Sequence, residues 1–523
     1  MIWKTLPQKN KDLIEQLLIN RGLNTALQKE RFFNPKIEDF KKDLEIKNIN
    51  IAKKRILKAI KKQELIFVSG DYDVDGICGA AVLYLGLTSL GAKVLPYIPH
   101  REKEGYGLSK IGLEQAKEKG ASLVISVDCG IVDFEEAEYA KKLGLDLIIT
   151  DHHQTLAKKP EAFIIIHSTK MCGTAVGWCL VKSLLKEGSD ELLDLVAIAT
   201  VADMMPMMGL NRAFVTQGLV KLNKTKRVGL LELASDAGVE LGKIGAYEIG
   251  HYLAPRLNAA GRLEFAMDAL RLVCTKDRAK AQALAKKLGS INTQRKELTL
   301  KAIETAKLKI IEEKKIHVLW DETWNPGIVG LVAGRVSEET GKPAIAISVG
   351  SEFSKGSARS ANGLNIIEVI RQCSDILVAV GGHPGAAGFT IHTSKIVEFQ
   401  KRLEVLVDGK ETKKRSLVIE AKLSSGEINL DLVKRLEEFE PFGIDNPKPI
   451  LASDKVRLTD LKTVGSGKHL KGKVDNVDFI AFGKGDLKEI LQEGILVNVA
   501  YDLEIDSFGN VEKPQLIIKD LQL

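Results

Sequence analysis

The alternation of β-rich and helical stretches between residues 64 and 153 constrains the fold more than any other feature of the sequence. Helical composition occupies 77–91 and the regions around 109–119 and 133–143. The β-rich runs are ELIFVSG (64–70), KVLPYIPH (93–100), ASLVISVDCG (121–130) and LDLIITDHH (145–153), with AFIIIHS (162–168) as a further candidate. Strands that alternate with helices in this way predict a mostly parallel sheet covered on both faces.

Acids and histidines stand where three of these strands end. The residues are Asp71, Asp73 and Asp75 after the first strand, Asp128 after the third, and Asp151, His152 and His153 after the fourth. Asp203 ends the apolar helical run LVAIATVADM and is a further candidate. Ligands of parallel sheets bind beyond the carboxyl ends of the strands, and buried carboxylates need a compensating charge. Carboxylate and imidazole together favour Mn²⁺ or Mg²⁺.

A structural interpretation of each acid alone is also available, because an aspartate after a strand usually caps a helix or forms a turn. Three strand ends with the same signal in one domain are hard to explain by caps alone. An acid shared by two ions would hold them about 3.5–4 Å apart, an arrangement that activates water and polarises a phosphoryl oxygen. The sequence therefore predicts a metal centre at this edge of the sheet.

The rest of the chain predicts further domains, as expected for 523 residues and 57.3 kDa. We expect an N-terminal helical cap over 1–50 and the parallel-sheet domain over 51–209. A helical connector is expected over 210–315 and a second α/β domain over 316–408. After the polar linker DGKETKKRS, short strand-like runs predict a small β-barrel within 409–523.

Composition limits the classes of function. The net charge of +7 is compatible with a polyanionic partner but is weak evidence by itself. The six cysteines are scattered without a CxxC pair, which indicates buried thiols in a reducing cytoplasm. No stretch approaches the roughly 18 consecutive apolar residues of a membrane span. We therefore expect a soluble, cytoplasmic protein with no membrane association.

Several motifs resemble those of a known superfamily. DYDVDG (71–76), SVDCG (126–130), TDHHQ (150–154) and VADMMPM (201–207) resemble the four ordered motifs of the DHH phosphoesterases. GGHPGAAGF (381–389) resembles the glycine-rich signature of their associated C-terminal domain. Further segments are similar to the RecJ single-strand-specific exonucleases and their OB-fold, namely HREKEGYG (100–107), APRLNAAGR (254–262), WNPGIVGLVAGR (324–335) and PFGIDNP (441–447).

The resemblance implies 5′→3′ degradation of single-stranded DNA to mononucleotides with two Mn²⁺ or Mg²⁺ ions, in DNA repair and recombination. The metal ligands that it implies are Asp73, Asp75, Asp128, His152 and Asp203, with Asp128 as the bridge. Asp71 and Asp151 would lie outside the ligand set and orient the ligands by hydrogen bonds. His153 would face the scissile phosphate. Ser69 replaces the histidine of the smaller DHH pyrophosphatases, which favours the nuclease branch.

The substrate contacts are expected from the later domains and from Arg101. The resemblance places Arg101, Arg262, Ser357 and Arg359 around a 5′-phosphate. Ser360 in SKGSARS and His383 in GGHPGAAGF are further candidates for the phosphate site. The glycines of GGHPGAAGF could bring backbone N–H groups to a phosphate, or could form a tight strand-to-helix packing turn. In the barrel, the trailing strand could be held by Lys462, Lys468, His469, Lys471 and Lys473. Most of the barrel aromatics Phe479, Phe482, Tyr501 and Phe508 could instead be core.

Two alternative functions stay open at this point. One is a phosphoesterase of the same superfamily that acts on short oligonucleotides or cyclic dinucleotides, which would need neither the helical connector nor the barrel. The other is a catalytically inactive DNA-binding scaffold, against which the complete set of acids argues. The family also implies a monomer, with a single-strand-binding protein and a helicase as partners of the single-stranded DNA enzyme.

Overall fold

The computed structural model describes residues 2–409, 416–507 and 511–523. It contains the expected parallel sheet, with the strand order β3-β2-β4-β5-β6 and every pair parallel. The strands are β2 (Leu65–Gly70), β3 (Lys93–Tyr97), β4 (Ala121–Val127), β5 (Asp146–Asp151) and β6 (Ile164–His167). The chain goes from β2 outward to β3 and then returns to β4 on the other side of β2. The crevice between β2 and β4 is therefore the point where ligands bind in such sheets.

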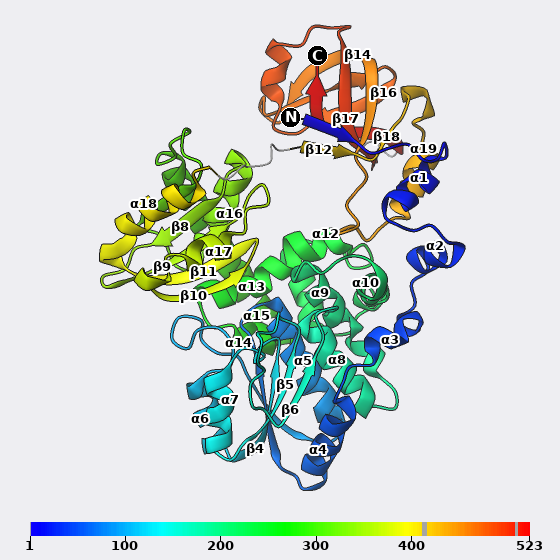
Figure 1. Ribbon diagram of the computed structural model, residues 1–523. Helices are drawn as coiled ribbons and strands as arrows, with labels where there is room; N and C mark the ends of the chain where they lie inside the picture. Colours follow the sequence, from blue (N-terminus) through cyan, green and yellow to red (C-terminus); the bar gives the residue numbers. More distant parts are fainter. Residues whose placement is uncertain (1, 410–415, 508–510) are drawn as a thin grey trace.

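Helices cover both faces of this sheet (Figure 1). One face packs against α4 (Ile49–Lys61), α5 (Val74–Ser89) and α8 (Gly173–Leu184) in the largest hydrophobic core. The other face packs against α6 (Lys110–Glu118) and α7 (Phe134–Lys142). Burial on both faces explains why these strands are nearly continuous apolar runs.

A helical region follows the sheet. Its elements are η2 (Ser189–Leu192), α9 (Leu193–Ala202), α10 (Gly209–Leu222), α11 (Val228–Ala237), α12 (Ala246–Glu248), the π-helical turn η3 (Ile249–Leu253), α13 (Ala254–Leu263), α14 (Met267–Cys274) and α15 (Arg278–Lys307). With 30 residues, α15 is long enough to lead from this region to the second α/β unit. Among the described residues no helix is both long and apolar enough to cross a membrane.

The second unit has a mixed sheet with the order β10-β11-β9-β8-β7, in which only β7 and β8 are parallel. Its strands are β7 (His317–Asp321), β8 (Ala344–Ser348), β9 (Phe353–Arg359), β10 (Leu377–His383) and β11 (Ala386–His392). Helix α16 (Val329–Thr340) covers one face, and α17 (Ile366–Arg371) and α18 (Ile396–Val407) cover the other. The glycine-rich signature lies in the β10–β11 hairpin, so its interpretation as a strand-to-helix turn was wrong.

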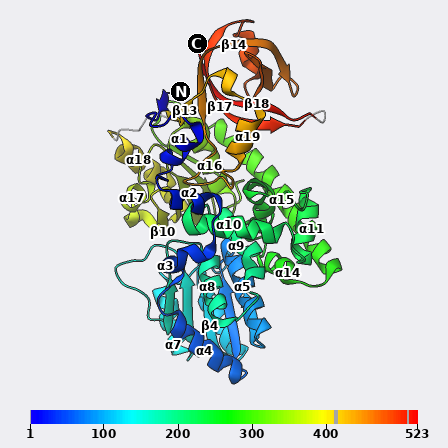
Figure 2. The ribbon, with the colours of Figure 1, turned by 90° about the vertical axis from the view of Figure 1, so that its right-hand side faces the viewer.

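The C-terminal sheet closes into a barrel, because β14 pairs with both β15 and β17. The strands are β13 (Ala421–Lys422), β14 (Leu451–Val464), β15 (His469–Val474), β16 (Val477–Ala481), β17 (Leu496–Asp506) and β18 (Lys513–Gln522), with α19 (Leu430–Glu437) packed beside them. Figure 2 shows the barrel at the end of the molecule opposite the first sheet. Most of the expected linker before it, residues 410–415, lies outside the described residues.

The N-terminal segment is more than the peripheral helical cap that we expected over 1–50. Strand β1 (Ile2–Thr5) pairs in parallel with β12 (Ser416–Ile419) beside the barrel. Helices α1 (Leu13–Asn20) and α2 (Ala26–Phe33) bury side chains in the core of the barrel. The short η1 (Ile37–Phe40) and α3 (Lys41–Leu44) then lead to α4. The segment from β1 to α2 therefore packs as part of the barrel domain at the other end of the chain.

Arg212 links the barrel to the helical region. Its guanidinium is fully buried and donates hydrogen bonds to the backbone carbonyls of Phe32, Phe439, Glu440 and Pro441. Because Arg212 belongs to α10, one side chain joins the N-terminal segment, the lead-in to the barrel and the helical region. Burial lowers the pKa of Arg212 to about 10, which still leaves the guanidinium charged near neutral pH.

Candidate active site

The acids predicted from the strand ends do meet at one edge of the first sheet. Asp73 is the N-cap of α5, and its Oδ1 accepts the backbone N–H groups of Asp75 and Gly76. Asp128 follows β4 in the left-handed backbone region, with φ 63°, a conformation that costs energy and is common at functional sites. Asp203 is the C-cap of α9. Different elements thus direct their carboxylates toward the end of β5.

His152 lies in the middle of these carboxylates. Its Nε2 is 3.2 Å from Oδ1 of Asp128, 3.7 Å from Oδ2 of Asp75 and 3.6 Å from Oδ2 of Asp203. The carboxylate of Asp75 also accepts the N–H groups of Gly173 and Thr174 at the start of α8, at 2.6 and 2.7 Å. Asp75 is therefore fixed in orientation by a helix N-terminus while one of its oxygens faces the imidazole.

Several buried atoms in this cluster have no hydrogen-bond partner among the described residues. They are Oδ1 of Asp71, Oδ1 of Asp128 and Nε2 of His152. Burial, reinforced by the neighbouring acids, raises the pKa of Asp128 and brings that of Asp203 to about 8. Leaving buried polar atoms unpaired is costly, and a cation removes that cost.

The ligand atoms fall into three groups in which all atoms lie within 4.8 Å of one another: Asp128, His152 and His153; Asp75, His152 and Asp203; and Asp71, Asp73 and Asp128. The ligand atoms in these three groups are all carboxylate oxygens or imidazole nitrogens. This set suits Mn²⁺ or Mg²⁺ rather than a metal bound by thiolates. Asp128 belongs to two of the groups, as a bridging carboxylate would. Asp71, expected behind the ligands, has an unpaired oxygen inside the cluster itself.

Asp151 is saturated by donors of the protein. It accepts the backbone N–H groups of Ile131, His152 and His153 at 2.9, 2.6 and 3.1 Å, and its Oδ1 lies 2.8 Å from Nδ1 of His153. Burial opposes the charged form of His153, but the hydrogen bond and charge of Asp151 outweigh it and raise the pKa of His153 to about 9. Asp151 is thus placed to orient the histidine pair and to keep His153 protonated.

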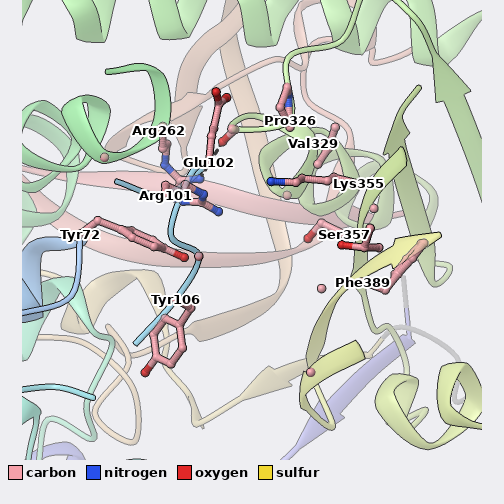
Figure 3. Close-up of a pocket in the computed structure, with 18 of the residues that line it drawn as sticks. Tyr72, Arg101, Glu102, Tyr106, Arg262, Pro326, Val329, Lys355, Ser357 and Phe389 are labelled. Atoms are coloured by element: carbon pink, nitrogen blue, oxygen red, sulfur yellow. Dashed lines mark hydrogen bonds between the residues drawn. The ribbon is translucent and has the colours of Figure 1, made fainter. Parts of the chain in front are cut away.

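The acidic cluster opens into a cleft of about 710 Å³ between the two α/β units. Asp71 and Asp73 line one side, and the expected phosphate contacts Arg101, Arg262, Ser357, Arg359 and His383 line the rest. Figure 3 shows Arg101 and Arg262 side by side, with Lys355 and Ser357 across the cavity. Ser360 is not part of the lining, because its hydroxyl is engaged with the carbonyl of Leu364.

The arginines of the cleft lack acidic partners. Within the described residues, neither Arg101, Arg262 nor Arg359 forms a salt bridge, and the Arg359 guanidinium instead donates to the hydroxyl of Ser357 at 3.0 Å. Burial, together with the positive charges of Arg101 and Arg359 nearby, lowers the pKa of Arg262 to about 10. Clustered cations without counter-ions form a site for an anion, and the guanidinium fork suits phosphate.

Glycine permits the close approach of α13 that places Arg262. A Cβ on Gly261 would lie 2.2 Å from the carbonyl oxygen of Tyr72, so only glycine fits there. In the same interface Oδ1 of Asn258 accepts the backbone N–H of Val74 at 3.1 Å. The motif APRLNAAGR therefore fastens α13 directly onto the acidic turn.

Comparison with known proteins agrees with this architecture. The DHH family N-terminal domain matches residues 65–200, the DHHA1 domain matches 313–408 and the RecJ OB domain matches 419–520. The single-stranded-DNA-specific exonuclease RecJ of Bacillus subtilis is 37% identical over 97% of this chain and 67% of that protein. RecJ of Thermus thermophilus is 34% identical over 88% of this chain and 70% of that protein. The chain belongs to the RecJ family.

Solved RecJ structures share the fold. The Thermus thermophilus RecJ crystal structure in complex with Mn²⁺ covers 100% of this chain and 79% of its own, with a TM-score of 0.87 at 28% identity. The same protein in complex with Mg²⁺ gives a TM-score of 0.80. The predicted order of DHH domain, helical region, DHHA1 domain and OB barrel is thereby confirmed for this RecJ-family chain.

Some residues of the RecJ-family cleft were missed from sequence. The Tyr106 hydroxyl donates to the backbone carbonyl of Asp128 at 3.2 Å and lies 3.1 Å from Nε2 of His153. The ring of Tyr72 lies under the Arg101 guanidinium at 4.8 Å. Lys355 and Asn258 also line the cleft. The tyrosines do stand inside the motifs HREKEGYG and DYDVDG, which was the only available signal.

The barrel positions give a mixed result. Phe479 and Tyr501 are fully buried core residues, whereas Phe482 is 57% exposed and packs edge-on against His469. Phe508 lies outside the described residues. Among the expected cations, Lys471 and Lys473 face Asp506 and Asp460 at 3.9 and 3.3 Å. Lys462 and Lys468 complete the set, on β14 and in the turn before β15. Core packing thus takes two of the three barrel aromatics that the structure describes.

Proposed function

We propose that this protein is a metal-dependent exonuclease specific for single-stranded DNA, which degrades its substrate 5′→3′ and releases 5′-mononucleotides in DNA repair and recombination. The observation that carries the proposal is the cleft itself. It joins a buried cluster of acids, in which Asp71 and Asp128 each have an oxygen without a hydrogen-bond partner, to arginines that form no salt bridge among the described residues. Hydrolysis next to a terminal phosphate requires such a combination. Membership of the RecJ family and the Mn²⁺ and Mg²⁺ complexes of its relatives support it.

In this proposal two divalent ions are held by Asp73, Asp75, Asp128, His152 and Asp203, with Asp71 close enough to contribute. Such ions, when bound, supply an activated water and polarise a phosphoryl oxygen. Asp128 belongs to two of the three ligand groups and is the natural shared ligand. Asp151 keeps His152 and His153 in place through its four hydrogen bonds.

The other residues bind and orient the strand. Arg101, Arg262 and Arg359 with Ser357 hold the 5′-phosphate, so that the first phosphodiester falls beside the acids of the same cleft. His153, protonated near neutral pH, lies 3.9 Å from Oδ1 of Asp128 and is placed to stabilise negative charge on the scissile phosphate. Exclusion of duplex DNA is part of the proposal, because a cleft enclosed between two α/β units favours a single strand over a duplex.

The decisive experiment uses single strands labelled at the 5′ or the 3′ end, with Mn²⁺ or Mg²⁺, beside the matching duplex and a reaction without metal. We expect immediate release of the 5′ label as a mononucleotide, sparing of the duplex and no reaction without metal. Release from the 3′ end first would refute the polarity. Turnover of dinucleotides alone would instead establish the small-substrate alternative.

A further inference from the structure

A cluster of exposed aromatic rings stands on the helical region outside the cleft. Tyr247 is 60% exposed and Tyr252 is 38% exposed, and His251 is also on the surface. The rings of Tyr247 and His251 are stacked, with centroids 4.0 Å apart and an interplanar angle of 21°. The ring of Tyr252 lies edge-on to Tyr247 with centroids 6.1 Å apart. Large rings exposed together in one place indicate a contact surface.

The local backbone explains why the rings gather. Residues 249–253 form a π-helical turn, in which the hydrogen bonds run from i to i+5. Residues four and five positions after Tyr247 therefore both lie on its side of the helix. Ile249 and Leu253 on the inner side are buried and anchor the turn. Single π-turns are rare and are often found at functional sites, and this one holds the rings in place before any ligand arrives.

The turn lies between the metal-binding cluster and the barrel. It runs directly into α13, whose other end carries Arg262 in the cleft, about 15 Å further along the helix axis at 1.5 Å per residue. Gly250 packs near Val201 of α9, the helix that ends at Asp203. After α9, the backbone N–H of Met207 donates to the carbonyl of Ile444 in the lead-in to the barrel, at 2.6 Å. Figure 1 shows α12 at the edge of the catalytic body that faces the barrel.

The cluster offers rings rather than charge. The cations nearest to it in sequence are already paired, Lys243 with Glu240 at 2.9 Å and Arg256 with Asp236 at 3.0 Å. A phosphate backbone would therefore find little to bind here, whereas the flat face of a nucleobase would. Stacking of a base on an aromatic side chain is favourable and insensitive to sequence, because every base has a π-face.

We propose that Tyr247 and Tyr252 form a stacking platform for nucleobases of the single strand that trails from the cleft toward the barrel. The proposal rests on the proposed function, since it takes the strand to be bound with its 5′ end at Arg262. The strand would then pass from the arginines of the cleft to the lysines of the barrel over an uncharged protein surface. This surface would bind its bases instead of its phosphates. The platform makes no contact with the scissile bond and acts only on substrates long enough to reach it.

The kinetic test compares substrate lengths. The variant Tyr247→Ala/Tyr252→Ala should lose about tenfold in kcat/KM on a 20-nucleotide strand and should equal wild type on a dinucleotide. The matched variant Tyr247→Phe/Tyr252→Phe keeps the rings and should behave as wild type. Phe163→Ala removes a ring that is 48% exposed next to the start of β6, at the opposite edge of the first sheet, and should change nothing. Equal activity of the alanine variant and wild type on the long strand would overturn the proposal.

A binding test without metal separates this proposal from the proposed function. Strands carrying 2-aminopurine at successive positions are mixed with the protein in chelator, and fluorescence quenching reports stacking. Quenching at an internal position in wild type and the phenylalanine variant, but not in the alanine variant, is the expected result. Identical quenching in all variants would refute the platform even if the strand is cleaved. Absence of cleavage by wild type would refute the proposed function, while this measurement would still test the platform.

Discussion

The two walls of the cleft carry opposite charges and are held in place in different ways. The acidic wall consists of strand and helix ends around the first sheet, with Asp203 contributed by α9 next to it. Backbone N–H groups fix the carboxylates of Asp73 and Asp75. The basic wall combines three distant segments, with Arg101 in a loop, Arg262 on α13 and Arg359 at the end of β9. One wall is therefore local in the fold, and the other exists only when two α/β units are held together.

Both walls are electrostatically unfavourable when nothing is bound. Burial raises the pKa of Asp128 and Asp203 on one side and lowers the pKa of Arg262 and Arg359 on the other, so each wall disfavours its own charge. Cations on one side and a phosphate on the other would relieve both penalties. The difference between the walls predicts two kinds of defect. Variants of the acids should lose hydrolysis, whereas variants of the arginines should lose recognition of the 5′-phosphate of the strand.

The largest effect is expected from Asp128→Asn. The substitution keeps the shape of the side chain but removes the charge of the acid that belongs to two ligand groups. Cleavage of a labelled single strand should fall to background in Mn²⁺ and in Mg²⁺, because hydrolysis depends on the bound ions. Binding of the same strand, followed by fluorescence anisotropy in chelator, should be retained. Asp190→Asn, an exposed acid, is the control, and unchanged cleavage by Asp128→Asn would contradict the metal assignment.

The basic wall should respond to the end of the substrate. Arg359→Ala should reduce kcat/KM on a 5′-phosphorylated strand by about 10- to 100-fold, the value of a charge-assisted hydrogen bond. The loss should be much smaller on a 5′-hydroxyl strand, which has no terminal phosphate to bind. Arg335→Ala in the same unit is the matched control, because this arginine is half-exposed and paired with Glu339 at 2.9 Å. Equal losses on both substrates would show that Arg359 does not contact the terminal phosphate.

The contrast between the walls also explains what could be predicted from the sequence. The acids after β2, β4 and β5 were predicted because each follows a strand, so their convergence follows from a parallel sheet alone. Asp203, at the end of an apolar helix, was a candidate for which the strand-end argument gave no position. Tyr106 and Asn258 were missed because their partners, Asp128 and Val74, are contributed by segments whose approach no local pattern encodes. Ser360 stays a prediction for the phosphate site, although its hydroxyl donates to the carbonyl of Leu364 and it does not line the cleft.

The N-terminal segment shows the same limit on a larger scale. Its helices were predicted, but strand β1 and its parallel pairing with Ser416–Ile419 were not. The two strands are separated by more than four hundred residues, so no turn or spacing connects them in the sequence. The fully buried Arg212 was likewise unpredictable, because its four acceptors are backbone carbonyls. Long-range packing, not local propensity, decides these contacts.

An effect on activity smaller than that of Asp128→Asn is expected from Asp151→Asn, which leaves the ligand set intact. The neutral amide cannot favour the imidazolium, so the pKa of His153 should fall from about 9 in the metal-free protein toward or below its ordinary value. Activity should fall by about 10- to 100-fold, as for other residues that orient metal ligands. NMR titration of the histidines without metal measures the pKa. A His153 pKa unchanged by the substitution would show that Asp151 does not control it.

The acidic wall should also control stability. The pKa of Asp203 is raised from 3.8 to about 8, so the folded protein binds more protons than the unfolded chain in that window. Stability of the metal-free protein should therefore decrease as pH rises from about 4 to 8. Mn²⁺ at one hundred times its Kd should restore about 2.7 kcal/mol at pH 8. Thermal unfolding at several pH values measures both effects. Asp128→Asn should reduce the stabilisation by Mn²⁺. Stabilisation of this variant as large as that of wild type would argue against Mn²⁺ binding at this cluster.

The smallest effect is expected from the barrel, which neither wall of the cleft includes. Lys462→Ala should weaken binding of a 20-nucleotide strand only a few-fold, because a single exposed lysine contributes one phosphate contact. The slope of log K against log salt should decrease in magnitude by about 0.7, the value for one contact to a single strand. Lys473→Ala is the informative comparison, since Asp460 at 3.3 Å already neutralises that lysine and its removal should change the slope less. If both variants leave the slope unchanged, the strand does not follow this face of the barrel, and charge recognition is confined to the cleft.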